Sequence, residues 1–177
     1  MTGMIAHHAQ AVRMASWAPT HGAGPRVLEL CRRIAISQRD EIAAMERWLA
    51  ARHLPVPDVD TATGAMGAPA GGMGASGAMA GMPGMAGDTL MPGMLTAAQL
   101  AQLDSARGPT FDALFLRFMI QHHRGALTMV QQLVNTPGAA QDGFVFQFAS
   151  DVNADQTAEI DRMRRLLAAL TFGEGSR

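Results

Sequence analysis

The chain carries two copies of one pair of motifs, in the same order and at nearly the same spacing. A Met-x-x-His-His motif occurs at Met4, His7 and His8 and again at Met119, His122 and His123. A Gln-x-x-Glu-x-x-x-Met motif follows each copy, at Gln38, Glu41 and Met45 and at Gln156, Glu159 and Met163. Two matched motifs in matched order indicate an internal duplication. Both halves of the chain are therefore expected to adopt the same local fold.

Apolar residues recur at three- and four-residue spacing in both halves, which predicts amphipathic helices. Their predicted ranges, bounded by Pro, Gly and Asn, are 2–17, 25–52, 110–134 and 140–170. Thr96 and Gln99 have the spacing of a capping box, so a short helix is predicted to begin there. Short loops near residues 19–24 and 135–139 favour antiparallel neighbours. The sequence thus predicts an all-α four-helix bundle, made of two helical hairpins related by approximate two-fold symmetry.

Residues 56–95 differ from the rest of the chain in composition. They are almost wholly Gly, Ala, Pro and Met, and their only charged residues are Asp58, Asp60 and Asp88. Such a segment buries too little apolar surface to offset its ordering entropy, so we expect a flexible linker. The predicted organisation is a first hairpin in residues 1–55, this linker, and a short helix with the second hairpin in residues 96–177. Both hairpins are expected to form one bundle.

Polar side chains take core positions in each predicted hairpin. His122 falls on the same helix face as Phe115 and Met119, and Glu159 shares a face with Met163. An unpaired buried polar group costs about 1–3 kcal/mol, so these groups are expected to meet one another or a cation. Counting from the first loop puts His7 at nearly the level of the Gln-x-x-Glu motif, with a mismatch of about 3 Å.

Imidazole and thioether groups together restrict the choice of metal. Imidazole binds several transition metals, whereas thioethers select Cu(I) and, by the same softness, Ag(I). We therefore predict a copper site, with Cu(I) favoured and other divalent metals left open. The candidate ligands in the helices are His7, His8, His122, His123, Met4, Met14, Met45, Met119, Met129, Met163, Glu41 and Glu159. Two alternatives stay open: the methionines fill gaps in the core, or the histidines hydrogen-bond Glu and Gln without metal.

Half of the 14 methionines lie in the predicted linker, where no core is expected. Met82-Pro-Gly-Met85 and Met91-Pro-Gly-Met94 each place two sulfurs across a turn. Such pairs resemble the methionine motifs of extracytoplasmic copper-handling proteins. They predict a second, weaker and mobile metal site, against the alternative of compositional drift in an Ala/Gly/Met tract.

Charge and cysteine content narrow the function classes. A formal net charge of -1 and a pI near 6.6 give no field that would attract nucleic acid or an anionic membrane. No apolar stretch reaches the roughly 18 residues that a membrane span needs, so no membrane insertion is expected. Cys31 is the only cysteine, which leaves no partner for an intrachain disulfide. His21 and His53 fall in a loop and at a helix end, and are expected on the surface.

The motifs resemble the bacterial domain-of-unknown-function family numbered 305. The matching residues are Phe111-Asp112, Phe115-Leu116 and Met119-Ile120-Gln121-His122-His123-Arg124-Gly125-Ala126, together with the downstream Gln-x-x-Glu-Ile-x-x-Met. The resemblance implies a ferritin-like four-helix bundle, usually exported, with relatives that bind copper in the periplasm and contribute to copper resistance. The first copy departs from the pattern because Gln10 stands where the second has Gly125. It also lacks the preceding Asp and Phe, so we expect a truncated first repeat and a missing export signal.

The leading hypothesis is a periplasmic or extracellular copper-binding protein that buffers, transports or confers resistance to copper and is not an enzyme. Its expected partners are the metal ion and copper-export or copper-chaperone proteins; the sequence leaves its oligomeric state open. A metal-free helical interaction protein of the envelope is the alternative. A ferritin-like di-metal oxidase is disfavoured, because no Glu is followed three residues later by His.

Overall fold

The computed structural model describes residues 1–60, 65–66 and 90–173. Its helices are α1 (Thr2–Ser16), α2 (Pro25–Ala50), α3 (Ala97–Ser105), α4 (Gly108–Asn135) and α5 (Gly143–Gly173). The strands β1 (Val59–Asp60) and β2 (Ala65–Met66) pair antiparallel over two residues each. The predicted all-α fold is confirmed, and each predicted end of a long helix lies within three residues of the observed one.

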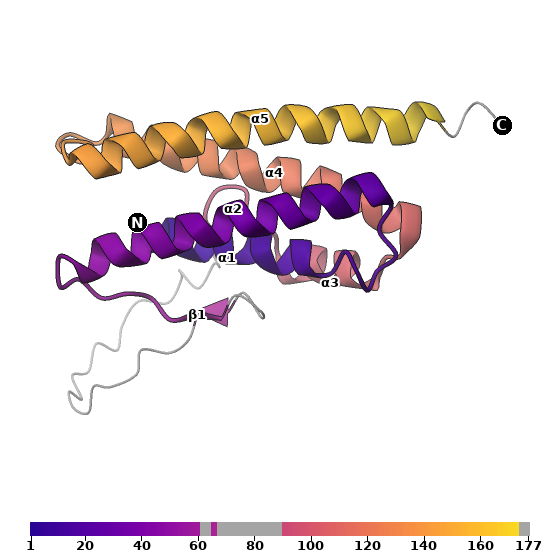
Figure 1. The fold of residues 1–177 in the computed structure, drawn as a ribbon, viewed down its shortest axis with the longest axis horizontal. Helices are drawn as coiled ribbons and strands as arrows, with labels where there is room; N and C mark the ends of the chain where they lie inside the picture. The colour runs from indigo at the N-terminus through magenta and orange to yellow at the C-terminus, as the bar shows by residue number, and fades with distance from the viewer. Residues whose placement is uncertain (61–64, 67–89, 174–177) are drawn as a thin grey trace, which may run out of the picture.

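The four long helices run alongside one another as two hairpins, α1 with α2 and α4 with α5 (Figure 1). The hairpins meet mainly through α1 and α4. Pro25 and Pro109 occupy first-turn positions of α2 and α4, where a missing backbone N–H is tolerated. The Thr96 and Gln99 side chains form the predicted capping box at the start of α3. None of the described helices is both long and apolar enough to span a membrane.

The main apolar core lies at the end of the bundle that carries the loop between α1 and α2. Its largest fully buried members include Phe111 and Phe115 of α4, Met14 of α1, Ile34 of α2 and Leu103 of α3. A smaller cluster lies toward the opposite end of the α1–α2 hairpin, built on Ile5, Val12, Ile42, Met45 and Leu49. The helical faces predicted to be apolar are thus the faces that pack together.

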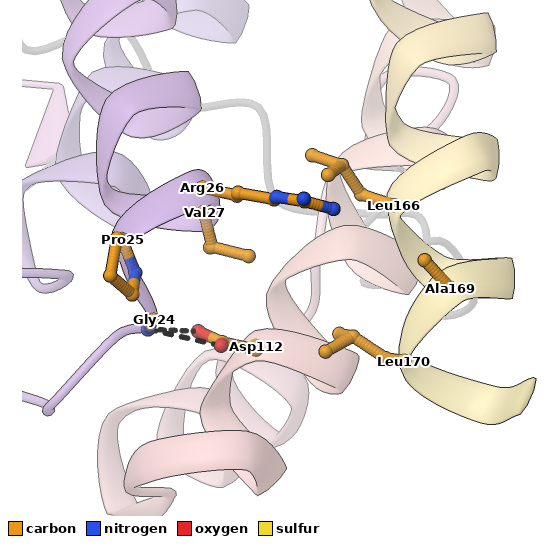
Figure 2. Close-up of a pocket in the computed structure, with 8 residues that line it drawn as sticks. All are labelled: Gly24, Pro25, Arg26, Val27, Asp112, Leu166, Ala169 and Leu170. Carbon is orange, nitrogen blue, oxygen red and sulfur yellow. Dashed lines mark hydrogen bonds between the residues drawn. The ribbon is translucent and has the colours of Figure 1, made fainter. Parts of the chain in front are cut away.

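A carboxylate from the second hairpin caps the first turn of α2. Both oxygens of Asp112 accept from the backbone N–H of Gly24, at 3.2 Å and 3.0 Å (Figure 2). Gly24 has no side chain with which to cap the helix, and a Cβ there would lie 2.8 Å from Asp112 Oδ2. Burial raises the pKa of Asp112, an effect that the Gly24 N–H partly opposes. This contact ties α4 to the start of α2.

Residues 91–95, which we call the crossing segment, lie over the line where α1 meets α4. Sequence composition assigned them to the flexible linker, but the structure gives them specific partners. The Gln10 side chain donates to the Leu95 carbonyl at 3.1 Å and accepts from the Leu95 N–H at 2.8 Å. The Pro92 carbonyl accepts from His7 Nε2 at 3.0 Å. These bonds anchor the crossing segment to α1.

The crossing segment explains why the two repeats differ at equivalent positions. A Cβ on Gly125 would lie 1.9 Å from the Pro92 carbonyl oxygen and 2.5 Å from Gly93 Cα. Only glycine therefore lets the segment approach α4 this closely. The equivalent residue in α1 is Gln10, whose amide pairs with the backbone of the same segment. One repeat supplies the space and the other supplies the hydrogen bonds.

The predicted surface position of His21 is wrong, because its side chain is only 5% exposed. Its Nε2 donates to the Asp104 carbonyl at 2.8 Å, and its ring stacks on Trp17 with centroids 6.0 Å apart. The ring also contacts Phe111, at 5.2 Å between centroids. His21 thus joins the α1–α2 loop to α3 and α4. His53 is exposed, as expected.

Replacing Asp112 by Ala should remove the cap on α2. Loss of such a cap costs about 0.5–2 kcal/mol of unfolding free energy, and 1 kcal/mol corresponds to roughly 2–4 °C in a chain of this size. Thermal unfolding followed by circular dichroism measures the change. Asp161→Ala is the control, because Asp161 is exposed and, within the described part of the chain, pairs only with Arg164. Equal melting temperatures for the two variants would contradict the capping role.

Replacing Gly125 by Ala should destabilise the protein, although alanine alone favours a helix by about 1 kcal/mol. The added Cβ must displace the crossing segment, and overpacking of this kind costs about 1–3 kcal/mol. Amide hydrogen exchange of residues 91–95 should also become faster. Gly143→Ala is the matched control, because no atom lies within 4 Å of the Cβ added there. A Gly125→Ala protein as stable as this control would show that the segment is not held as described.

Candidate metal centre

The four motif histidines are fully buried on the inner faces of α1 and α4. Consecutive residues of a helix point about 100° apart, so the two histidines of each motif face different neighbours. His7 and His122 face each other between the hairpins, with ring centroids 3.8 Å apart and planes inclined by 36°. These two residues are equivalent in the duplication, so their contact lies on the approximate two-fold axis of the bundle.

The two half-sites repeat each other closely. His8 Nε2 lies 2.5 Å from Glu41 Oε2, and His123 Nε2 lies 2.6 Å from Glu159 Oε2. Within each motif, the two ring centroids are 6.4 Å and 6.2 Å apart. In each hairpin the Met-x-x-His-His motif therefore lies against the Gln-x-x-Glu motif, at the height along the helices that was predicted by counting residues from the first loop. Each carboxylate is partly exposed, while its histidine is not.

Much of the hydrogen-bonding capacity in this interior has no partner among the residues that the structure describes. Gln38 and Gln156 are 1% and 2% exposed, and they lie one helical turn before the two glutamates. Eight buried side-chain atoms lack a hydrogen-bond partner among the described residues: His7 Nδ1, His8 Nδ1, both nitrogens of His122, His123 Nδ1, both polar atoms of the Gln38 amide and Gln156 Oε1. The His–Glu pairs therefore satisfy only part of the polar interior.

Burial keeps the central pair of imidazoles uncharged. Burial, together with the charges of neighbouring His8 and His123, lowers the pKa of His7 to about 3, against the raising effect of the Pro92 carbonyl. Burial likewise lowers the pKa of His122 well below its ordinary value, and the charge of His7 is the next largest cause of this lowering. A neutral imidazole has one nitrogen with a free lone pair, which is the form that binds metals.

The hydrogen bonds also identify the lone-pair nitrogen of His7. A carbonyl oxygen only accepts, so the proton of the neutral ring is on Nε2, bonded to Pro92. Nδ1 then carries the lone pair, and it is one of the atoms without a partner among the described residues. His122 has no such constraint, because neither of its nitrogens is hydrogen-bonded there.

The candidate methionines that the structure describes fall into four environments. Met14, Met119 and Met163 are buried in the main apolar core, and Met45 is buried in the smaller cluster. Met4 and Met129 are half-buried and line one cavity at the other end of the α1–α4 contact. Met91 and Met94 of the crossing segment are half-buried. Met82 and Met85 lie outside the described residues.

The described side chains do not form a complete coordination site of nitrogen and oxygen ligands. Within residues 1–60, 65–66 and 90–173, no three His, Cys, Asp or Glu side chains converge on one point as metal ligands do. A metal ion would need thioethers, or small shifts of the imidazole and amide groups. Asp155 is a further acidic group that the sequence analysis missed. Asp155 is exposed on α5, where partial desolvation and the charges of Glu41 and Glu159 raise its pKa, and the period of α5 alone does not single it out.

The Pro92 carbonyl and Gln10 are also contacts of this centre that the motifs did not predict. Pro92 contributes through its backbone, which no side-chain pattern reveals. Gln10 carried a usable signal, because it is the position at which the first repeat departs from the second.

The family match and the similar solved structures point to the same protein family. The family described as "Domain of unknown function (DUF305)" matches residues 1–167. A DUF305 protein of Streptomyces coelicolor, assigned as secreted, has a TM-score of 0.73 at 26% identity, over 96% of this chain and 90% of its own. A DUF305 fragment from Deinococcus radiodurans has a TM-score of 0.68 at 25% identity, over 93% and 90%. A search of curated proteins gave no match.

CopM is a third similar structure. Its Cu(II)-bound form has a TM-score of 0.66 at 27% identity, over 94% of this chain and 92% of that one. Its Cu(I)-bound form has a TM-score of 0.61, also at 27% identity, over 92% and 89%.

The family match spans four helices and most of α5, and it includes both copies of the duplicated motifs. The resemblance predicted from those motifs is confirmed: the chain belongs to the DUF305 family.

Proposed function

We propose that this protein binds copper, preferentially Cu(I), at the centre of the bundle, and that copper is its cargo rather than a catalytic cofactor. The observation that carries the proposal is the buried His7–His122 pair. Its rings lie 3.8 Å apart, and three of its four nitrogens have no partner in the described part of the chain. Leaving a buried polar group unpaired costs about 1–3 kcal/mol, and a bound metal ion would remove that penalty.

The ligand types favour copper over harder metals. The central imidazoles are neutral, and the Met-x-x-His-His spacing puts a thioether one helical turn from an imidazole in each repeat. Such a set suits a soft ion, Cu(I) or its analogue Ag(I), better than a hard divalent ion. The likeness to CopM, whose structures include Cu(I)- and Cu(II)-bound forms, supports copper.

A metal-free helical interaction protein is the competing interpretation. It accounts for Nε2 of His8 and His123, which are paired with Glu41 and Glu159. It gives no reason for burying His7 against His122. A di-metal oxidase would need several carboxylates around one cavity. Glu41 and Glu159 are instead engaged with histidines, so we propose a binding protein and not an enzyme.

We also propose that the protein acts outside the cytoplasm, in the periplasm or beyond it, in copper buffering, transport or resistance. The similar Streptomyces coelicolor protein is assigned as secreted, which supports this location. Copper-export or copper-chaperone proteins are the partners that such a role would need.

Replacing both His7 and His122 by Ala should weaken Cu(I) binding by at least about 100-fold, since loss of even an outer-shell partner costs 10–100-fold. The measurement is a competitive titration of the reduced protein against a chromogenic Cu(I) chelator, with circular dichroism to verify the fold. His53→Ala is the control, because His53 is an exposed histidine.

Each result of this titration has a definite meaning. Tight binding that is lost in the double variant and kept in the control supports the proposal. Binding that the double variant retains would remove the central imidazoles from the site. No binding by the unmodified protein would leave the metal-free interpretation.

A further inference from the structure

A cavity of about 140 Å³ opens beside the first turn of α1. It is lined by apolar side chains such as Val130, Phe148 and Val152, and by three methionines, Met1, Met4 and Met129. Among the described residues that line it, no side chain carries nitrogen or oxygen. Thioether sulfur is therefore the one side-chain donor that this cavity offers to a metal ion.

The crossing segment brings another sulfur to the same place. A Cβ added to Gly3 would lie 3.2 Å from Met91 Sδ and 3.7 Å from Met129 Cε. Both methionines thus rest against one point on α1, and Gly3 leaves room for the sulfur. Met4 is the next residue of α1 and lines the cavity with Met129. Met91 and Met129 thus approach Gly3, and Met4 shares the cavity with Met129, so three thioethers from α1, α4 and the crossing segment lie around the first turn of α1.

The duplication supplies an internal comparison. Met14 and Met119 are the equivalents of Met129 and Met4, respectively. They are fully buried in the main core with Phe111 and Phe115. The equivalent pair at the other end is half-exposed, lines a cavity and has Met91 close by. Core packing explains the first pair, but it does not explain why a third methionine is held beside the second.

The cavity lies close to the imidazoles along α1 and along the crossing segment. Met4 lies one helical turn from His7 on α1. The crossing segment that carries Met91 also carries the Pro92 carbonyl, which is bonded to His7 Nε2. An ion held by the thioethers would thus sit about one helical turn, roughly 5 Å along the axis, from the central pair.

We propose that Met4, Met91 and Met129 form a separate thioether site for a soft monovalent cation, Cu(I) or Ag(I), through which the ion reaches the imidazoles. This inference rests on the proposed copper function and specifies its outer site. Neutral sulfur ligands without an anionic partner favour a monovalent soft ion and give little affinity for hard divalent ions. No change of oxidation state is involved, because the ion passes from sulfur to nitrogen as Cu(I).

The test uses Ag(I), which binds thioethers and is redox-inert under these conditions, on the protein with ¹³C-labelled methionine methyl groups in chloride-free buffer. The background is His7→Ala/His122→Ala, which removes the central pair. One equivalent of Ag(I) should shift the methyl signals of Met4, Met91 and Met129. Single Met→Leu variants assign these signals. Zn(II) should not shift them.

The corresponding triple variant, Met4→Leu/Met91→Leu/Met129→Leu, should bind Ag(I) on the order of 10-fold or more weakly, since it lacks the soft ligands. Leucine is close to methionine in volume, so the fold should be retained. The matched control, Met14→Leu/Met45→Leu/Met163→Leu, changes three methionines that are fully buried in the apolar clusters, and it should keep the affinity and the shifts.

The outcomes separate this proposal from the proposed function. Unmoved methyl signals, or equal Ag(I) affinity with and without the three Met→Leu changes in the His7→Ala/His122→Ala background, would overturn the thioether site even if Cu(I) still needed His7 and His122. Shifts that persist in the histidine background support the site even if the central pair proved not to bind Cu(I).

Discussion

Four imidazole rings in an apolar interior are the constraint on which the rest of this structure depends. A buried polar ring is stable only where hydrogen-bond partners replace the water it has lost, and the four rings do not have equal numbers of such partners. His8 and His123 each meet a glutamate from the other helix of their own hairpin, so these pairs fix α1 against α2 and α4 against α5. His7 and His122 meet each other where the hairpins join. Each hairpin thus pairs one histidine with a glutamate. Hydrogen-bonding capacity that the described residues do not use remains in both hairpins, at Gln38 and Gln156, and at the contact between them, at His7 and His122.

A single segment that crosses an approximately two-fold symmetric bundle must contact the two halves differently. The crossing segment passes over the contact between α1 and α4, close to the approximate axis, and so it meets the two repeats in different ways. Gln10 binds its backbone as another peptide group would, and Gly125 gives up its side chain to make room for it. The same asymmetry sets the two methionine pairs apart, because only the Met4–Met129 end has Met91 beside it. Duplication therefore accounts for the paired histidines of the centre, whereas the crossing segment accounts for the different contacts of the two repeats around it.

Sequence periodicity was sufficient for the helices and for the level at which the motifs meet, because both depend on local geometry. The capping box at Thr96, and the level at which the histidine motif meets the Gln-x-x-Glu motif, follow from residue spacing. The crossing segment could not be predicted in this way. Its Gly, Pro and Met composition has no period, and its position depends on Gln10 and Gly125, which are distant in sequence. His21 failed as a prediction for the same reason, since Asp104 and Phe111 bury a ring that lies in a loop.

The Pro92 carbonyl also determines what a metal ion at the centre has to displace. An ion on His7 Nδ1 takes a free lone pair and leaves the crossing segment in place. An ion on Nε2 must break the bond to Pro92 and strain the two bonds between Gln10 and Leu95 that hold the same segment. Only the second mode would couple metal occupancy to the position of Met91, because a ligand shifts a conformational equilibrium by its difference in affinity for the two states. His122 carries no such linkage, since neither of its nitrogens is bonded within the described chain. The two rings that duplication made equivalent are therefore different ligands, and the crossing segment is the cause.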